Sequence, residues 1–386
     1  MHFALIKGTW KFLLAMSRNF QANLPGSSLD SNSCVRHNKV HLMTNDDLFG
    51  DLLKNVSRSF YLTIRVLPLE LRQPIGLAYL LARAADTIAD TAIVAPGLRL
   101  EFLLSLRSQI NHQVDAAQLV RIESALMQHQ SDRHERNLLQ ALQPALELLQ
   151  ELDDFDRQQV RHVVTVLTQG MEFDLTYFPQ ESSGRLAGLI TTADLERYTY
   201  LVAGCVGDFW TLMSARHTTA FHGCNIPMLS TIGIRFGKAL QYTNVLRDCA
   251  KDLRIGRCYV PLEHLLPANL KPEDLLDIAN EARARPVLKS LLKLALDHYR
   301  EAITYTLTIP ERFGRLRLAC LWPILIGLET LKRLAASDAW LDPAKPSKVP
   351  RQEVYKLMAF SLPAAGSDTI IKGWMDRLIV DVEKML

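Results

Sequence analysis

Sequence signals for β-strands, for membrane-spanning helices and for nucleic-acid binding are nearly absent from this chain. No stretch alternates apolar and polar residues over a strand's length, and no Asn-Gly or Asp-Gly hairpin turn occurs. No apolar run reaches the roughly 20 residues of a membrane span. The longest one, residues 318–328, is short and contains a proline. The net charge is only +3 and no basic tract occurs, which argues against a nucleic-acid partner.

Cysteine is also scarce, with six residues that form no CxxC pair and no zinc-type pattern with histidine. This usage predicts reduced thiols and a cytoplasmic protein. Peripheral contact with the surface of the inner membrane stays possible, because the lack of a spanning segment excludes insertion but not surface binding.

Several catalytic signatures are missing as well. The segment GIRFGKA has one residue too few between its glycines for a phosphate-binding loop, and no Ser or Thr follows Lys238. HExxH, GxSxG and the dinucleotide-binding glycine pattern do not occur. The sequence therefore gives no support to P-loop NTPases, zincin proteases, α/β-hydrolases or Rossmann enzymes.

What is present is helical periodicity from residue 45 almost to the end, with 48% hydrophobic and 22% charged residues among 386. This predicts an all-α protein with a single large helical domain over residues 43–360 and a helical tail over residues 361–386. Residues 1–42 are apolar and then loop-like. They are read either as a membrane-surface or targeting segment, or as a poorly ordered extension upstream of a start at Met43, which we favour.

The most informative stretch is ALQYTNVLRDCAKDLRIGRCYVP, residues 239–261. On a helix, Gln241, Asn244, Asp248 and Asp252 share one face, and Gly256 offers a stop. The basic residues beside this stripe are Arg247, Arg254 and Arg257. Carboxylate and amide oxygens suit a hard cation, and guanidinium groups bind phosphate, so the stripe predicts magnesium and phosphate ligands.

A second polar stripe occurs in the segment PIGLAYLLARAADTIAD, residues 74–90. On a helix, Tyr79, Arg83, Asp86 and Asp90 share one face. Pro74 suits the first turn of this helix. Two carboxylates four residues apart repel by about 0.2–0.5 kcal/mol on a bare helix, and a divalent ion would reverse that cost. With 41 acidic residues in the chain, such pairs also arise by chance on solvated helices. The apolar surroundings and the shared arginine favour a site.

Other segments hold weaker candidates. Ser57, Arg58 and Ser59 precede an apolar run, where they would either hold phosphate or simply cap a helix. Gly170, inside a helical pattern, predicts a close helix contact or the approach of a ligand. Asp174 and Tyr177, on the next turns, are possible site members.

Residues 194–213 combine a tyrosine with small residues. Ala203, Gly204 and Gly207 form a face that lets a helix approach another helix or an apolar ligand. Tyr198 lies ahead of this face and is either a core residue or a proton relay. The strongly apolar helices expected over residues 285–307 and 315–334 line either a core or a long apolar pocket.

Four of these segments together resemble the squalene and phytoene synthases, a family of all-helical head-to-head prenyltransferases. The resemblance runs in order from Asp51 to Leu331 through SRSFYLTIRVLP, YLLARAADTIAD, YTYLVAGCVG and QYTNVLRDCAKDLRIGRCYVP. It implies a helical bundle of the isoprenoid synthase type with a central apolar cavity. It also implies a magnesium-dependent enzyme that binds farnesyl diphosphate, here expected as a monomer.

The resemblance assigns roles to matching positions. Magnesium ligands would be Asp86, Asp90, Asn244, Asp248 and Asp252. Diphosphate contacts would be Ser57, Arg58, Ser59, Tyr79, Arg83, Gln241, Asn244, Arg247 and Arg257. Residues acting in catalysis would be Asp86, Asp90, Asp248, Asp252, Tyr79 and Tyr198, the last near the proton-loss or cyclopropyl step. Lys251 stands where many members have an acidic residue, and its neighbour Asp252 is kept.

The product is predicted from a later segment. KVPRQEVYKLM resembles a region of squalene synthases that reduce their intermediate with NADPH, with Lys348 and Arg351 on basic positions and Pro350 departing from the pattern. We therefore expect squalene, made with NADPH. Alternatives are a phytoene or dehydrosqualene synthase without reductant, and a non-catalytic helical assembly factor. Ala84 and Ala85 before Asp86 argue against a chain-elongating enzyme with a DDxxD motif.

Overall fold

The computed structural model describes residues 48–57, 60–179 and 183–386, and within these ranges the chain is almost entirely helical. The predicted extension, residues 1–42, lies outside the described residues. The first half contains η1 (Leu48–Leu52), α3 (Leu53–Ser57), α4 (Phe60–Val66), α5 (Leu69–Asp90), α6 (Pro96–Asn111), α7 (Ala116–Met127), α8 (Arg133–Gln140), α9 (Leu142–Glu151) and α10 (Asp154–Tyr177).

The second half alternates long helices with short turns. It contains β1 (Ala187–Gly188), α11 (Thr192–Thr199), η3 (Tyr200–Gly204), α12 (Cys205–His217), α13 (Ile226–Arg254), β2 (Arg257–Cys258), α14 (Leu262–Leu265), η4 (Leu266–Ala268), η5 (Pro272–Leu276), η6 (Ile278–Asn280), α15 (Glu281–Thr308), η7 (Glu311–Phe313), α16 (Gly314–Ala336), α17 (Arg351–Ala364) and α18 (Asp368–Glu383). The predicted all-α class is confirmed.

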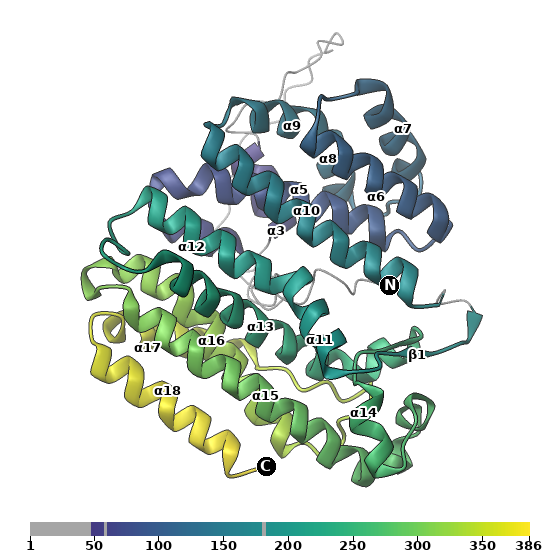
Figure 1. Ribbon diagram of the computed structural model, residues 1–386, viewed down its shortest axis with the longest axis vertical. Coiled ribbons are helices and arrows are strands. Elements are labelled where there is room, and N and C mark those ends of the chain that lie inside the picture. The colour runs from purple at the N-terminus through teal and green to yellow at the C-terminus, as the bar shows by residue number, and fades with distance from the viewer. Residues whose placement is uncertain (1–47, 58–59, 180–182) are drawn as a thin grey trace, which may run out of the picture.

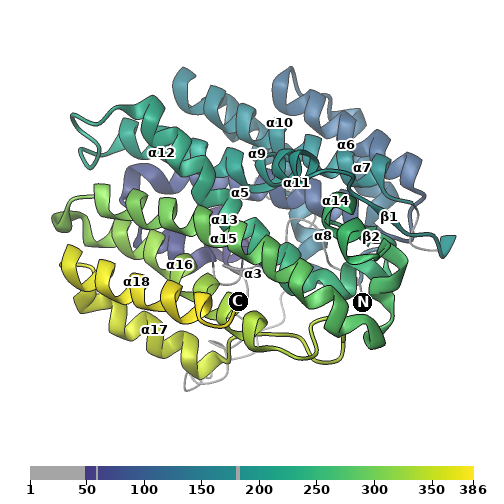
Figure 2. The same ribbon diagram turned by 60° about the horizontal axis from the view of Figure 1, so that its bottom comes forward.

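The helices stack in chain order from one end of the molecule to the other. In Figure 1, α5 to α10 lie at the top, α11 to α13 cross the middle, and α15 to α18 lie at the bottom. Figure 2 shows the same order from another side, with α13 and α15 running through the centre. The hydrophobic core is continuous through all of these layers. Within the described ranges, each helix is too short or too polar to traverse a lipid bilayer.

The ends of the central helices follow from their sequences. Asn225 caps α13 by accepting a hydrogen bond from the Met228 amide, and Pro227 occupies the first turn. Gly256 ends the helix with a φ of +86°, a left-handed conformation that residues with a side chain rarely adopt. The predicted stop at Gly256 is therefore confirmed.

The predicted start of α5 is wrong by about one turn, because the helix begins at Leu69 and Pro74 lies inside it. Proline has no amide proton, so it cannot bond to the carbonyl four residues earlier, that of Glu70. Glu70 is exposed, so water can satisfy this carbonyl and the helix can begin earlier.

Small residues draw two central helices into direct contact. A Cβ placed on Gly207 of α12 would lie 1.8 Å from the carbonyl oxygen of Gly233 on α13. A Cβ on Gly237 would lie 2.2 Å from the carbonyl oxygen of Ala203. The predicted small-residue face thus packs backbone against backbone. Gly170 on α10 likewise lies against Val202, so its predicted close helix contact is confirmed.

The C-terminal helices pack onto the bundle. α18 buries Ile371, Met375 and Leu378 and lies against α15 and α16, as both views show. The predicted division after residue 360 falls inside α17. The five cysteines of the described chain are free thiols: Cys205, Cys224, Cys249, Cys258 and Cys320.

Candidate active site

The acidic stripe of α5 is buried around one arginine. Asp86 is fully buried, and Arg83 binds its carboxylate through one nitrogen and that of Glu135 through the other. Thr87 donates its hydroxyl to the second oxygen of Glu135. Burial alone would lower the pKa of Arg83, but the charges of Asp86 and Glu135 raise it above its ordinary value. The guanidinium is therefore a fixed positive charge inside the bundle.

Tyr79 connects α5 to α3. Its hydroxyl donates to the carbonyl of Val56 on α3 at 3.1 Å, one residue before Ser57. Ser57 is buried at the end of α3 and donates its hydroxyl to the carbonyl of Leu53, one turn earlier in the same helix. Arg58 and Ser59 lie outside the described residues. The predicted phosphate-binding role of this segment stays a prediction.

The acidic stripe of α13 lies on one face of the last four turns of that helix. Gln241, Asn244 and Asp252 are buried. The side chain of Asp248 is 21% exposed and accepts a hydrogen bond of 2.6 Å from Arg247. Asn244 donates to the carbonyl of Leu240 at 2.8 Å, while its own side-chain oxygen has no hydrogen-bond partner among the described residues.

The unpaired side-chain oxygen of Asn244 is relevant to the predicted magnesium site. A buried carbonyl oxygen without a donor beside carboxylates is a suitable ligand for a hard cation. The described residues contain no group of three His, Cys, Asp or Glu side chains drawn together as a complete metal site. Magnesium is often held by only one or two carboxylates together with substrate phosphates, so the donors of α5 and α13 fit it. The ligand set itself stays a prediction.

Arg257 links the two stripes. It lies in β2, whose two residues pair in parallel with β1 directly after the turn at Gly256. Burial would lower the pKa of Arg257, but four acidic groups raise it above its ordinary value: Tyr259, Asp174, Asp90 and Asp252. Asp90 ends α5 and Asp252 lies near the end of α13. The guanidinium of Arg257 therefore interacts electrostatically with both acidic helices.

A buried carboxylate flanks this arginine. Asp174 on α10 accepts hydrogen bonds from Tyr259 at 2.9 Å and from Tyr198 at 3.3 Å, and Arg257 lies 3.9 Å away. The two tyrosine rings stack with centroids 4.6 Å apart. Burial raises the pKa of Asp174 to about 7, although Arg257 and both tyrosines act in the opposite direction. Tyr198 is thus buried and bonded to a proton acceptor.

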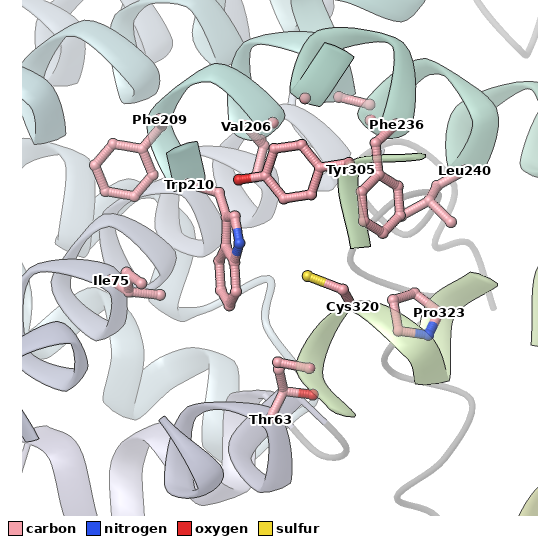
Figure 3. Close-up of a pocket in the computed structure, with 15 residues that line it drawn as sticks. Thr63, Ile75, Val206, Phe209, Trp210, Phe236, Leu240, Tyr305, Cys320 and Pro323 are labelled. Carbon is pink, nitrogen blue, oxygen red and sulfur yellow. The ribbon is translucent and has the colours of Figure 1, made fainter. Parts of the chain in front are cut away.

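An apolar pocket with a cavity volume of about 90 Å³ lies along the same helices that carry these groups. Figure 3 shows the rings of Phe209, Trp210, Phe236 and Tyr305 around it, with the thiol of Cys320 on the opposite wall. Its wall comes from α4, α5, η3, α12, α13, α15 and α16. The apolar helices 285–307 and 315–334 therefore form mainly core, with four of their residues lining the pocket.

The cavity and the acidic groups share two helices. Ile75 of α5 and Leu240 of α13 line the cavity. At about 1.5 Å per residue, Asp86 lies roughly 16 Å further along α5 and Asp248 roughly 12 Å further along α13. In both helices the acids follow the cavity-lining residues toward the C-terminus. Each of these helices therefore carries an apolar part that lines the pocket and, toward its C-terminus, a charged part, an arrangement that suits an amphiphile with an anionic head.

Of three further residues at the site, the sequence pattern predicts one and misses two. Glu135 is missed, because nothing in the polar segment RHERNLLQ indicates burial. Tyr259 is also missed, although its spacing of two from Arg257 in an extended segment places both side chains on one face. Asp174 is a sequence candidate that the structure brings together with Tyr198.

The predicted NADPH contacts lie elsewhere on the molecule. Lys348 is exposed in the loop before α17, and Arg351 is the exposed first residue of that helix. Two cations at a helix N-terminus suit a phosphate group. Their role in binding NADPH stays a prediction.

These features define an all-α bundle with two acid-bearing helices beside an apolar cavity, the architecture of isoprenoid synthases. The chain matches the sequence model of the squalene/phytoene synthase family over residues 53–353, and it belongs to that family.

Curated relatives within the family include enzymes of two kinds. The chain is 28% identical over 324 residues to a bifunctional lycopene cyclase/phytoene synthase of Pyrenophora tritici-repentis, covering 82% of this chain and 51% of the relative. It is 27% identical over 264 residues to a squalene synthase of Saccharomyces cerevisiae, covering 68% and 56%. The chain thus spans about half the length of these relatives.

Solved structures show the shared fold. A complex of TcSQS with the ligand BPH1237 superposes with a TM-score of 0.67 at 20% identity, covering 87% of this chain and 96% of that chain. A dehydrosqualene synthase in complex with a ligand gives a TM-score of 0.54 at 23% identity, covering 82% and 95%.

Proposed function

We propose that this chain condenses two molecules of farnesyl diphosphate head to head, with magnesium, to presqualene diphosphate, and then reduces this product to squalene with NADPH. The observation that carries the proposal is the pair of acid-and-arginine stripes on α5 and α13, the two helices that also line one apolar pocket. Membership of the squalene/phytoene synthase family supports it.

The first task of the site is to admit the diphosphate groups. Several negative charges cannot enter a buried apolar region without opposite charge. The buried guanidinium groups of Arg83 and Arg257 supply positive charge, and the side chain of Arg247, which is only 9% exposed, adds a third. Magnesium, held by Asp86, Asp90, Asn244, Asp248 and Asp252, would neutralise further charge and stabilise the leaving diphosphate.

The second task is to protect the allylic carbocation that remains when diphosphate departs. Water would capture this cation, and the wall of the cavity is almost entirely apolar. The rings of Phe209, Trp210 and Phe236 line this apolar space, and the electron-rich face of such a ring attracts a cation.

The third task is to accept the proton that is lost when the cyclopropane ring forms. Tyr198 is the proposed acceptor at the substrate, and it can pass its own proton to Asp174, to which it is hydrogen-bonded. A carboxylate with a pKa of about 7 can hold this proton near neutral pH. Tyr259 and Arg257 fix the position of the carboxylate.

A second candidate function is phytoene or dehydrosqualene synthesis, which needs no reductant. The phytoene synthase among the curated relatives favours it. The segment around Lys348 and Arg351 favours squalene, because its two cations suit the additional phosphate of NADPH. A non-catalytic role is disfavoured, because all four aspartates of the two stripes are present. The free thiols are in keeping with our proposal of a cytoplasmic location.

Product analysis separates these functions. The full chain is incubated with labelled farnesyl diphosphate and magnesium, with and without NADPH, and the hydrocarbons are separated by chromatography. Squalene formed only with NADPH supports the proposal. A more unsaturated product formed regardless of NADPH identifies the second function. No product with farnesyl diphosphate or with geranylgeranyl diphosphate contradicts the enzymatic assignment.

A further inference from the structure

The segment that follows α16 is a loop, yet part of it is buried. Trp340 is 4% exposed and Leu341 is fully buried. A buried loop needs hydrogen-bond partners for its backbone, and here the start of α15 supplies them. Arg285 donates to the carbonyl of Ser337, and the amide of Leu341 donates to the carboxylate of Glu281 at 2.8 Å. The loop is therefore held at a fixed place on the bundle.

Trp340 connects this loop to the second acidic helix. Its indole N–H donates to the carbonyl of Leu246 on α13 at 2.8 Å, from 94 residues away in the sequence. In an α-helix this carbonyl also accepts from the amide four residues further on, so it has two donors. The next residues are Arg247 and Asp248, whose side chains are joined by two hydrogen bonds of 3.1 and 2.6 Å. Trp340 thus binds the turn of α13 that carries this pair.

The loop reaches α13 on the side away from its acidic stripe. At 3.6 residues per turn, Leu246 lies about 160° around the helix from Asp248. Asn244 and Asp252, one turn before and one turn after Asp248, share its face. A hydrogen bond at the back of the helix therefore fixes the rotation and depth of the acidic face without contacting what binds there.

We propose that Trp340 is a positioning residue for the magnesium and diphosphate site. Through its hydrogen bond to Leu246 it holds the turn that carries Arg247 and Asp248. The inference rests on the proposed function, because it concerns the same site. Residues that orient metal ligands without touching the metal change its affinity by roughly 10–100-fold when they are lost. A side chain that only filled the core would contribute to stability and leave the affinity of the folded site unchanged.

The test uses Trp340→Phe in the full chain, which keeps an aromatic ring and removes the N–H donor. Isothermal titration calorimetry measures the binding of inorganic diphosphate in excess magnesium, and we expect the dissociation constant to rise about tenfold. Without ligand, amide hydrogen exchange over residues 246–252 should be faster than in the wild type, because the turn loses an external hydrogen bond. If Trp340→Phe does not fold, Trp340→Met, which also lacks a donor and adapts its shape, takes its place with the same expectation.

Trp322→Phe is the matched control. Trp322 on α16 is 6% exposed, and its indole donates at 2.9 Å to the hydroxyl of Ser361 on α17. The substitution therefore removes the same group from a similarly buried site that does not contact α13 through this bond. Thermal unfolding should show similar losses of stability in the two phenylalanine variants. The affinity for magnesium diphosphate should fall only in Trp340→Phe.

A double-mutant cycle tests whether Trp340 acts through the acidic turn. In a chain that carries Asp248→Asn, adding Trp340→Phe should weaken diphosphate binding by a smaller factor than it does in the wild type, because the pair that Trp340 positions is already altered. Fully additive effects of the two substitutions would overturn the inference.

The remaining outcomes separate this inference from the proposed function. Equal affinity of Trp340→Phe and the wild type overturns the inference alone, and so does an equal loss of affinity in both tryptophan variants. Unchanged hydrogen exchange over residues 246–252 also contradicts it. If the wild type binds no magnesium diphosphate, the proposed function of the two acidic stripes fails together with the inference.

Discussion

Glu135 on α8 binds the guanidinium of Arg83 on α5, and both side chains are almost completely buried. The same guanidinium also binds Asp86, one turn further along α5. Arg83 therefore has two acidic partners, of which only Asp86 belongs to the stripe expected to face magnesium and diphosphate. If Asp86 binds magnesium as proposed, Glu135 can still hold Arg83 in place.

The variant Glu135→Gln tests this positioning role. The variant replaces a charge-assisted buried hydrogen bond with a neutral one while Asp86 still balances Arg83, and we expect a loss of about 1–3 kcal/mol in the free energy of unfolding. If the chain has the proposed activity, KM for farnesyl diphosphate should rise more than kcat falls, because Arg83 loses its orientation. Urea unfolding and steady-state kinetics measure the two effects.

The control for this variant is Glu172→Gln, which breaks a partly exposed pair with Arg107. Such pairs contribute about 0–1 kcal/mol, so stability should change little. Equal stability of Glu135→Gln and the wild type would show that the buried pair is not what holds Arg83.

Asp174 should make stability depend on pH. Its pKa is about 7 in the folded chain and 3.8 when unperturbed, so the folded state binds more protons between these values. Its contribution to the free energy of unfolding is therefore greatest below pH 3.8 and is lost as pH rises through 7, by up to about 1.4 kcal/mol per pH unit. Asp174→Asn should remove this slope.

Urea unfolding of both proteins from pH 5 to 8 measures the difference. All other ionisable groups are the same in the two chains, so their effects cancel in the comparison. Parallel stability profiles for the wild type and Asp174→Asn would contradict a raised pKa at this position.

The contact between α12 and α13 should tolerate no added methyl group. In Gly207→Ala the new Cβ would meet the carbonyl oxygen of Gly233, which is backbone and cannot rotate away. We expect a loss of about 3 kcal/mol or more, because the helices must separate. Both glycines also line the cavity, so catalysis should suffer as well.

Gly373→Ala is the matched control in an exposed turn of α18, where an added Cβ meets nothing within 4 Å. It should raise stability by about 0.5–1 kcal/mol, because alanine restricts the unfolded chain more than glycine. Thermal unfolding of the two variants should therefore show shifts of opposite sign. Equal shifts would contradict a backbone contact at Gly207.

The sequence predicted the features that depend on local spacing. Periodicity placed Asp86 and Asp90 on one helix and Asp248 and Asp252 on another, and the left-handed stop at Gly256 followed from its residue type. The resemblance to a family supplied the order of the motifs and the fold, which the comparisons confirm.

The remainder depends on contacts between distant segments. Glu135 reaches Arg83 from 52 residues away, and Tyr259 reaches Asp174 from 85 residues away. Neither pair has a periodic signature, because the partners lie on different elements. The start of α5 was misplaced for a different reason, since the solvent exposure that tolerates Pro74 inside the helix is a tertiary property.

The central claim is that the two acidic helices act together on a prenyl diphosphate. The most direct measurement is the release of inorganic diphosphate from farnesyl diphosphate in the presence of magnesium, for the wild type, Asp86→Asn and Asp248→Asn. The account predicts release by the wild type and a loss of at least a hundredfold in either variant, with their folded state verified by circular dichroism. Full release by either variant would contradict it.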